Sequence, residues 1–166
     1  MITIIAGTNR KGSNTKKVAL QYQKILAEKN IESKLLALED VNIFERTAVF
    51  EIIENDFLKP ANKFIFVIPE YNGSYPGVLK LILDNSDVNK VWPNKKALLV
   101  GVASGRAGNL RGMEHFTGAL MHVKMLVHHN RLPISSIHNL LNEVGEITDA
   151  GTLKTINVQL DEFINF

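Results

Sequence analysis

Residues 64–77 read Phe64-Ile65-Phe66-Val67-Ile68-Pro69-Glu70-Tyr71-Asn72-Gly73-Ser74-Tyr75-Pro76-Gly77. The five apolar residues predict a buried strand, and the prolines and glycines that follow predict a tight loop. Ligands of open α/β folds bind at the rim of the sheet, where strands end in such loops. The tyrosine, asparagine and serine side chains can lie along a flat heteroaromatic ring and hydrogen-bond its polar edge. Taken alone, the loop is either one wall of a ring pocket or a plain turn.

Four further apolar runs predict strands at residues 2–6, 33–38, 97–103 and 124–128. Between them, helical spacing of apolar residues predicts helices at residues 14–30, 76–85, 110–121 and 152–166. Strands that alternate with helices require a parallel sheet covered on both faces. The sequence therefore predicts one α/β domain over residues 1–166, a three-layer, doubly wound sheet of five strands. We expect residues 133–149 to form an irregular, exposed excursion with a role in assembly.

The bulk composition is that of an ordinary globular protein, with 166 residues, 45% of them hydrophobic and 22% charged. The 19 lysines and arginines barely outnumber the 17 acidic residues and are scattered, which argues against a nucleic-acid partner. No apolar stretch approaches the ~20 residues that cross a bilayer and no basic leader is present, so we expect a cytoplasmic protein without membrane contact. The absence of cysteine excludes disulfides and thiolate chemistry, so any redox chemistry belongs to a bound cofactor.

The loop after the first predicted strand, residues 7–15, reads Gly-Thr-Asn-Arg-Lys-Gly-Ser-Asn-Thr. It leads into a helix, whose unpaired N–H groups and dipole favour an anion. The candidate anion ligands are Thr8, Arg10, Ser13, Asn14 and Thr15. The loop lacks both the Walker A and the Gly-x-Gly-x-x-Gly sequences, which favours a terminal monophosphate. The alternative is that a serine or asparagine side chain only caps the helix.

A third special loop, Ser104-Gly105-Arg106-Ala107-Gly108-Asn109, follows the fourth predicted strand. In a doubly wound sheet, the loops after the first, third and fourth strands can end around one crevice. Their shared ligand would have an anionic end at residues 7–15 and a flat, polar-edged end at residues 69–77. FMN has both properties.

Three motifs of this chain resemble those of the NADPH-dependent FMN reductase family, a flavodoxin-like group with azo-, quinone- and chromate-reducing members. The motifs are Gly7-Thr8-x-Arg10-x-x-Ser13-Asn14-Thr15, Pro69-Glu70-Tyr71-Asn72-Gly73-Ser74-x-Pro76-Gly77-x-Leu79-Lys80, and Ser104-Gly105-x-Ala107-Gly108 with Leu110-Arg111. The resemblance covers nearly the whole chain and implies a flavodoxin-like sheet with strand order 2-1-3-4-5. The family usually continues the middle motif with Lys-Asn and then Asp-Trp, whereas this chain has Lys80-Leu81 and Asp84-Asn85. An aromatic residue is thus missing where family members often build a subunit contact or the edge of the substrate cleft.

The resemblance implies a flavoprotein oxidoreductase of the flavin, quinone or azo reductase type, with FMN bound non-covalently. NADPH or NADH would deliver hydride to flavin N5, and a small-molecule acceptor would receive the electrons, so no catalytic side chain is required. The phosphate would lie among Thr8, Arg10, Ser13, Asn14 and Thr15, and the isoalloxazine ring among Pro69, Glu70, Tyr71, Asn72, Ser74, Ser104, Gly105 and Arg106. Arg106 would stabilise the reduced ring, meet the dinucleotide phosphate, or bond a carboxylate. Family likeness also implies a homodimer or homotetramer.

The five histidines do not predict a metal site. His128 and His129 are neighbours at the end of a predicted strand, so their side chains should point to opposite faces. His115 and His122 are two helical turns apart and are expected at the surface or in an interface. Two other functions stay open. One is a flavodoxin-like FMN electron carrier without its own NAD(P)H oxidation, against which the basic pI of about 8.8 argues, and the other is a non-redox module that retained the fold.

Overall fold

Six parallel strands form the sheet of the computed structural model, which describes residues 1–166. They are β1 (Ile2–Ala6), β2 (Ser33–Ala37), β3 (Lys63–Pro69), β4 (Lys96–Val102), β5 (Leu126–Val127) and β6 (Leu132–Ile134). The order is β2-β1-β3-β4-β5, and β6 also pairs with β4. The predicted strand order and doubly wound α/β class are therefore confirmed, with a sixth strand that the sequence did not predict.

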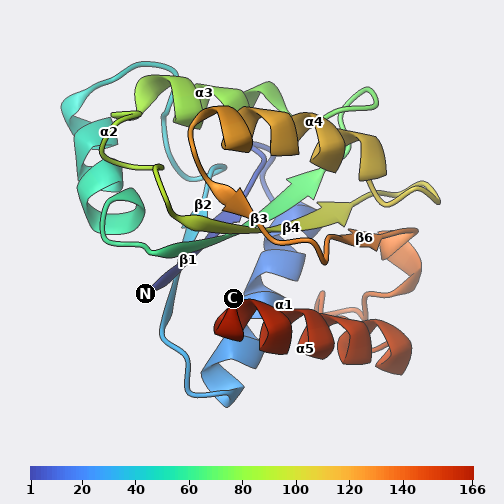
Figure 1. Cartoon of the computed structure of the whole chain (residues 1–166). Helices are drawn as coiled ribbons and strands as arrows, with labels where there is room; N and C mark the ends of the chain where they lie inside the picture. Colours follow the sequence, from blue (N-terminus) through green and yellow to red (C-terminus); the bar gives the residue numbers. More distant parts are fainter.

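Helices cover both faces of the sheet and make three layers (Figure 1). On one face lie α1 (Asn14–Glu28) and α5 (Ala150–Asn165); on the other lie α2 (Ala48–Ile53), α3 (Gly77–Asn85) and α4 (Leu110–His122). A π-helical turn, η1 (Glu54–Leu58), extends α2, and a short 3-10 turn, η2 (Ile137–Asn139), precedes α5. No helix is long and apolar enough to cross a membrane.

The central strand β3 shows why the sheet is apolar on both sides. Phe64, Phe66 and Ile68 face the core beneath α2, α3 and α4, whereas Ile65 and Val67 face the core beneath α1 and α5. All five side chains have no solvent exposure. A strand buried on both faces reads as a continuous apolar run, because each face has its own hydrophobic layer to contact.

The edge of the sheet beyond β4 differs from the sequence prediction. The expected strand at residues 124–128 is reduced to the two residues of β5, which pair with Lys96 and Ala97. The chain then leaves the sheet and returns as β6, which pairs with residues 100–102 of β4. The expectation that His128 and His129 point to opposite faces is wrong, because β5 ends before them and they are not in a strand; their ring centroids lie 4.5 Å apart.

Residues 133–149 are not simply an exposed excursion. Ile134, Ile137 and Ile147 from this segment are at most 3% exposed and join the core beneath α1 and α5. Backbone hydrogen bonds fix the segment to the loop after β4, from Ile137 N to Ala103 O and from Ser136 N to Gly105 O, both at 3.1 Å. The segment therefore forms part of the wall at the carboxyl end of the sheet.

Candidate functional site

The loops that follow β1, β3 and β4 surround one cavity of about 400 Å³ at the carboxyl end of the sheet. Of the residues that the sequence predicted for the site, the lining includes Thr8, Arg10, Ser13, Asn14, Thr15, Pro69, Glu70, Tyr71 and Ser104. The lining does not include Asn72, Ser74, Gly105 and Arg106. The lining is completed by residues that were not predicted for the site, Lys11, Gly12, Val102, Ala103, Ile137 and His138. The three loops therefore converge as expected, on a somewhat different set of residues.

The loop after β1 is built as the start of a helix. Ser13 is the N-cap of α1, and its Oγ accepts a hydrogen bond from the Lys16 N–H at 3.1 Å. Ser13 thus caps the helix, and the first N–H groups of the helix stay open, since these have no intrahelical partner. Thr8 is 1% exposed, and its Oγ1 accepts from the Arg10 N–H at 3.2 Å, which folds the loop back on itself. The amino terminus of α1 therefore lines the cavity, and a helix terminus of this kind favours an anion.

The loop after β3 is a tight turn with two left-handed residues. Asn72 has φ 51° and Gly73 has φ 76°, and Tyr71 and Ser74 exchange backbone hydrogen bonds of 2.9 and 3.1 Å across them. Asparagine followed by glycine is the usual sequence for a two-residue turn of this kind, because both tolerate positive φ. Tyr71, at the start of the turn, lines the cavity, and Asn72, at its tip, does not.

Tyr71 joins the first and second loops. Its hydroxyl shares a 2.5 Å hydrogen bond with Thr8 Oγ1, and the Arg10 guanidinium lies 4.2 Å from the centre of its ring. A cation over an aromatic face is attracted by the ring's negative face. These two contacts join the loop after β1 to the loop after β3 at the wall of the cavity.

The loop after β4 is held by Asn109, which is 1% exposed. The side-chain amide donates to the carbonyl oxygens of Ile68 at 3.0 Å and Pro69 at 2.9 Å, so this loop is tied to the end of β3. Ser104 lines the cavity, but the side chain of Arg106 is exposed and forms no ion pair. Its backbone carbonyl accepts a 2.8 Å hydrogen bond from Ser135 Oγ, which fixes the main chain at that point.

One predicted ring residue, Ser74, lies beside α4 and outside the lining of the cavity. Ser74 Oγ shares a 2.9 Å hydrogen bond with Nδ1 of His115, and Arg111 lies against Gly73. His115, which was expected only at the surface or an interface, therefore contacts the loop after β3. This histidine was missed because no local pattern in the sequence connects α4 to a loop more than thirty residues earlier.

The lining is positively charged. It contains Arg10 and Lys11 and a single acidic residue, Glu70, and His138 contributes a ring whose Nδ1 is 3.3 Å from Asn14 Nδ2. Hydroxyl, amide and cationic donors gather at one end, while Val102, Ala103 and Ile137 line the apolar part with Tyr71. This donor set fits a ligand with a phosphate at one end and a flat, largely apolar body, and FMN is such a ligand.

The fold and this cavity define a flavodoxin-like α/β protein with a site for a phosphorylated planar ligand. The chain belongs to the NADPH-dependent FMN reductase family, whose model matches residues 1–139. The resemblance stated from the sequence motifs is thereby confirmed.

Two curated relatives support the same family. The chain is 31% identical over 108 residues to an NAD(P)H-dependent FMN reductase of Pseudomonas aeruginosa, covering 62% of this chain and 57% of that protein. It is 27% identical over 107 residues to a 2-hydroxy-1,4-benzoquinone reductase of a Burkholderia species, covering 62% of this chain and 58% of that protein. The matched part thus spans less than two thirds of either relative.

Solved structures support the fold. A flavoenzyme NAD(P)H:(acceptor) oxidoreductase (FerB) from Paracoccus denitrificans superposes with a TM-score of 0.85 at 24% identity, covering 99% of this chain and 94% of that chain. An archaeal flavodoxin superposes with a TM-score of 0.63 at 16% identity, covering 97% of this chain and 95% of that chain. The flavodoxin-like architecture is therefore shared with both reductases and flavodoxins.

Proposed function

We propose that this protein is an NAD(P)H-dependent flavin oxidoreductase that binds FMN non-covalently and reduces a small acceptor of the quinone, azo or flavin type. The observation that carries the proposal is the joining of an anion-binding helix terminus to an aromatic wall through the Thr8–Tyr71 hydrogen bond, in one cavity of a chain from this family. FMN supplies hydride acceptance and onward electron transfer when it is bound. The protein supplies binding, orientation and shielding from water.

The phosphate end is assigned to the loop after β1. Ser13, Asn14 and Thr15 begin α1 and present backbone and side-chain donors, and Arg10 adds a charge. A hydrogen bond to a charged group contributes about 1.5–3 kcal/mol, so each such donor affects affinity measurably. Arg10 is already oriented by its contact with the Tyr71 ring, which reduces the entropy lost on binding.

The ring end is assigned to the loops after β3 and β4. Pro69, Glu70 and Tyr71 would meet the ring from one side, and Ser104 from another. Asn72, Ser74 and Gly105 would act at the rim or through backbone groups. The exposed guanidinium of Arg106 suits the dinucleotide phosphate better than the ring, because it does not line the cavity.

We further propose a cytoplasmic homodimer or homotetramer. Phe44, Val49 and Ile52 are each more than half exposed, and the last two lie one turn apart on α2. Burial of these side chains against a second copy would remove apolar surface from water. The absence of cysteine suits a reducing compartment. Light scattering on the eluted protein would report the mass of the assembly, and a monomer at micromolar concentration would contradict this part of the proposal.

The test is a spectrum of the purified protein with FMN, recorded before and after anaerobic addition of NADPH or NADH. We expect bound flavin absorbance that bleaches on reduction and returns when a quinone is added. Steady-state oxidation of NAD(P)H with a quinone separates a reductase from an electron carrier, which would hold the flavin without oxidising the dinucleotide. A protein that takes up no FMN would contradict the whole proposal.

A matched pair of variants tests the assignment of the phosphate end. Arg10→Ala should weaken FMN binding by about 10- to 100-fold, the equivalent of one charged hydrogen bond. Lys90→Ala removes a cation from the connection that leads into the other end of β4, and it should leave FMN affinity unchanged. Equal affinities of the two variants would place the phosphate elsewhere.

A further inference from the structure

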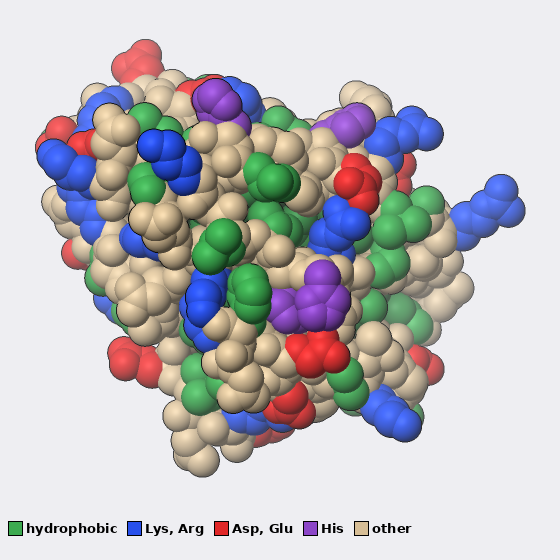
Figure 2. Space-filling model, in the orientation of Figure 1, with side chains coloured by type: hydrophobic (Ala, Val, Ile, Leu, Met, Phe, Trp, Pro, Cys, Tyr) green, Lys and Arg blue, Asp and Glu red, His purple; other side chains and the backbone are tan.

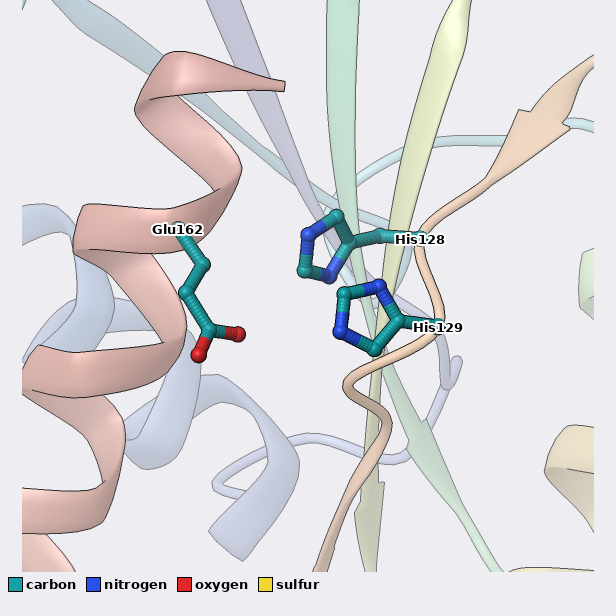
Figure 3. Close-up of side chains that lie close together, drawn as sticks. All are labelled: His128, His129 and Glu162. Carbon is teal, nitrogen blue, oxygen red and sulfur yellow. The ribbon is translucent and has the colours of Figure 1, made fainter.

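The break between β5 and β6 brings two histidines to the side of α5. His128 and His129 follow β5 directly, and Glu162 lies on the facing side of the helix, so that all three side chains point toward one space (Figure 3). One potential ligand atom from each residue lies within 4.8 Å of the other two. On the face drawn in Figure 2, histidine side chains lie at the surface directly against acidic ones. The cluster shares no residue with the cavity at the carboxyl end of the sheet.

The chemistry of this cluster matches a zinc site. Two imidazole nitrogens and one carboxylate oxygen are ligands that Zn²⁺ takes in proteins, with a fourth position left for water. Tetrahedral ligands at ~2.0–2.1 Å from zinc lie about 3.4 Å from one another. His129 and Glu162 are both exposed, so their side chains have room to rotate toward this separation.

One ligand is rigid, and the other two are open to solvent. His128 is 3% exposed, and the rings of Phe163 and Phe166 pack edge-on against it at 5.9 and 4.9 Å. The Asn130 N–H donates to its Nδ1 at 3.2 Å, a long hydrogen bond that a metal at this nitrogen would replace. A buried ligand beside two exposed ones gives a cation a path of entry.

The carboxylate is also positioned. Asn130 Nδ2 donates to Oε2 of Glu162 at 2.7 Å, which leaves Oε1 free for a metal. Asn130 is held in turn by the buried Gln159, whose Nε2 donates to the Asn130 carbonyl at 2.9 Å. Such hydrogen bonds behind the ligands orient a metal site. The nearby cation Lys63 is engaged by the carbonyls of Phe163 and Ile164 at 3.0 and 2.7 Å.

We propose that His128, His129 and Glu162 bind one Zn²⁺ ion or a similar divalent cation that prefers nitrogen ligands. The metal would join the interrupted edge of the sheet to α5. Because β5 pairs with the amino end of β4, the site lies away from the cavity at the carboxyl ends, and its role is structural. The proposal therefore stands apart from the proposed reductase activity.

The test is calorimetric titration of zinc chloride into the chelator-treated, FMN-saturated protein, without a histidine tag and in a buffer without phosphate. We expect one zinc per chain with a micromolar or lower dissociation constant, and a higher melting temperature with zinc present. His129→Ala and Glu162→Gln should each weaken binding at least tenfold. Both positions are exposed, so both variants should fold, and FMN affinity provides an independent check of folding.

The control is His122→Ala, which removes an exposed histidine at the end of α4 and should leave the zinc affinity unchanged. Absence of saturable one-to-one binding would overturn the proposal. So would a His129→Ala protein that binds zinc as tightly as the unaltered one, or a His122→Ala protein that loses binding equally.

Discussion

Replacement of Glu54 by glutamine should destabilise the protein by an amount that depends on pH. The Glu54 side chain has no solvent exposure and accepts from Arg46 at 3.0 and 3.1 Å, from Lys59 at 3.0 Å and from the Asp87 N–H at 2.6 Å. These donors, the Arg46 guanidinium first, lower the pKa of the Glu54 carboxyl from 4.5 to about 2 against the opposing effect of burial. The buried carboxylate thereby connects η1 to the segments before α2 and after α3.

The size of the effect follows from the pKa difference. One pKa unit corresponds to ~1.4 kcal/mol, so a fall from 4.5 to about 2 contributes about 3 kcal/mol at neutral pH. Because the folded-state pKa is depressed, this contribution is complete above pH 4.5 and is lost as the pH falls toward 2. At pH 3.5 about 2 kcal/mol remains by the same relation. At pH 7 the variant should melt ~6–12 °C lower.

Urea denaturation of Glu54→Gln and the unaltered protein at pH 7, 5 and 3.5 would measure these differences. Asp56→Asn is the matched control, because it removes an exposed carboxylate from the same π-helical turn and should change stability little at any pH. A loss of stability in Glu54→Gln that stays constant from pH 7 to 3.5 would refute the reasoning. It would show that the shape of the side chain, and not its charge, stabilises the folded protein.

Substitutions at three further positions test the packing around the cavity. Gly101→Ala should destabilise the protein by at least about 1–3 kcal/mol, as measured by urea denaturation, because the added Cβ would overlap the carbonyl oxygen of Gly108. Unchanged stability would contradict this close packing. Asn109→Ala should lower the free energy of unfolding by about 2–3 kcal/mol, because it removes two buried hydrogen bonds and strains a residue at φ 63°. Asn109→Gly relieves the strain and should lower it by less. A larger loss of stability in Asn109→Gly than in Asn109→Ala would be inconsistent with the backbone argument. In the FMN-free protein, Ser13→Ala should lower the free energy of unfolding by ~1 kcal/mol, because the N-cap is lost. The same substitution should weaken FMN binding. A variant with unchanged stability and unchanged FMN affinity would exclude both roles of Ser13.

The central strands could be predicted from sequence because they are buried on both faces. β1, β3 and β4 are continuous apolar runs bounded by turn residues, and the structure places them within two residues of the predicted limits. The edge of the sheet could not be predicted in the same way. Residues 124–128 are apolar enough for a strand, but only pairing with β4 decides where β5 stops and β6 begins.

The part of the cavity that is lined by consecutive residues could be predicted from the sequence. The loop after β1 carries its cap, hydroxyls and arginine within nine positions, and these residues line the cavity together. His138 and Ile137 could not be found, because backbone hydrogen bonds to the loop after β4 bring them in from a segment without a motif. The turn after β3 shows another limit of prediction from sequence. Its residues predicted a tight turn, but they did not show that Tyr71 lines the cavity and Asn72 does not.

The interrupted edge beyond β4 also limits how this sheet can grow. A long edge strand offers a row of free N–H and C=O groups on which a foreign strand can add, and this route leads to fibrous aggregation. Here the edge offers two residues in β5 and three in β6, with Pro133 lacking an N–H in the second segment. An incoming strand would find no continuous partner. On this side the chain is therefore protected against sheet extension, even though its apolar strands would otherwise favour it.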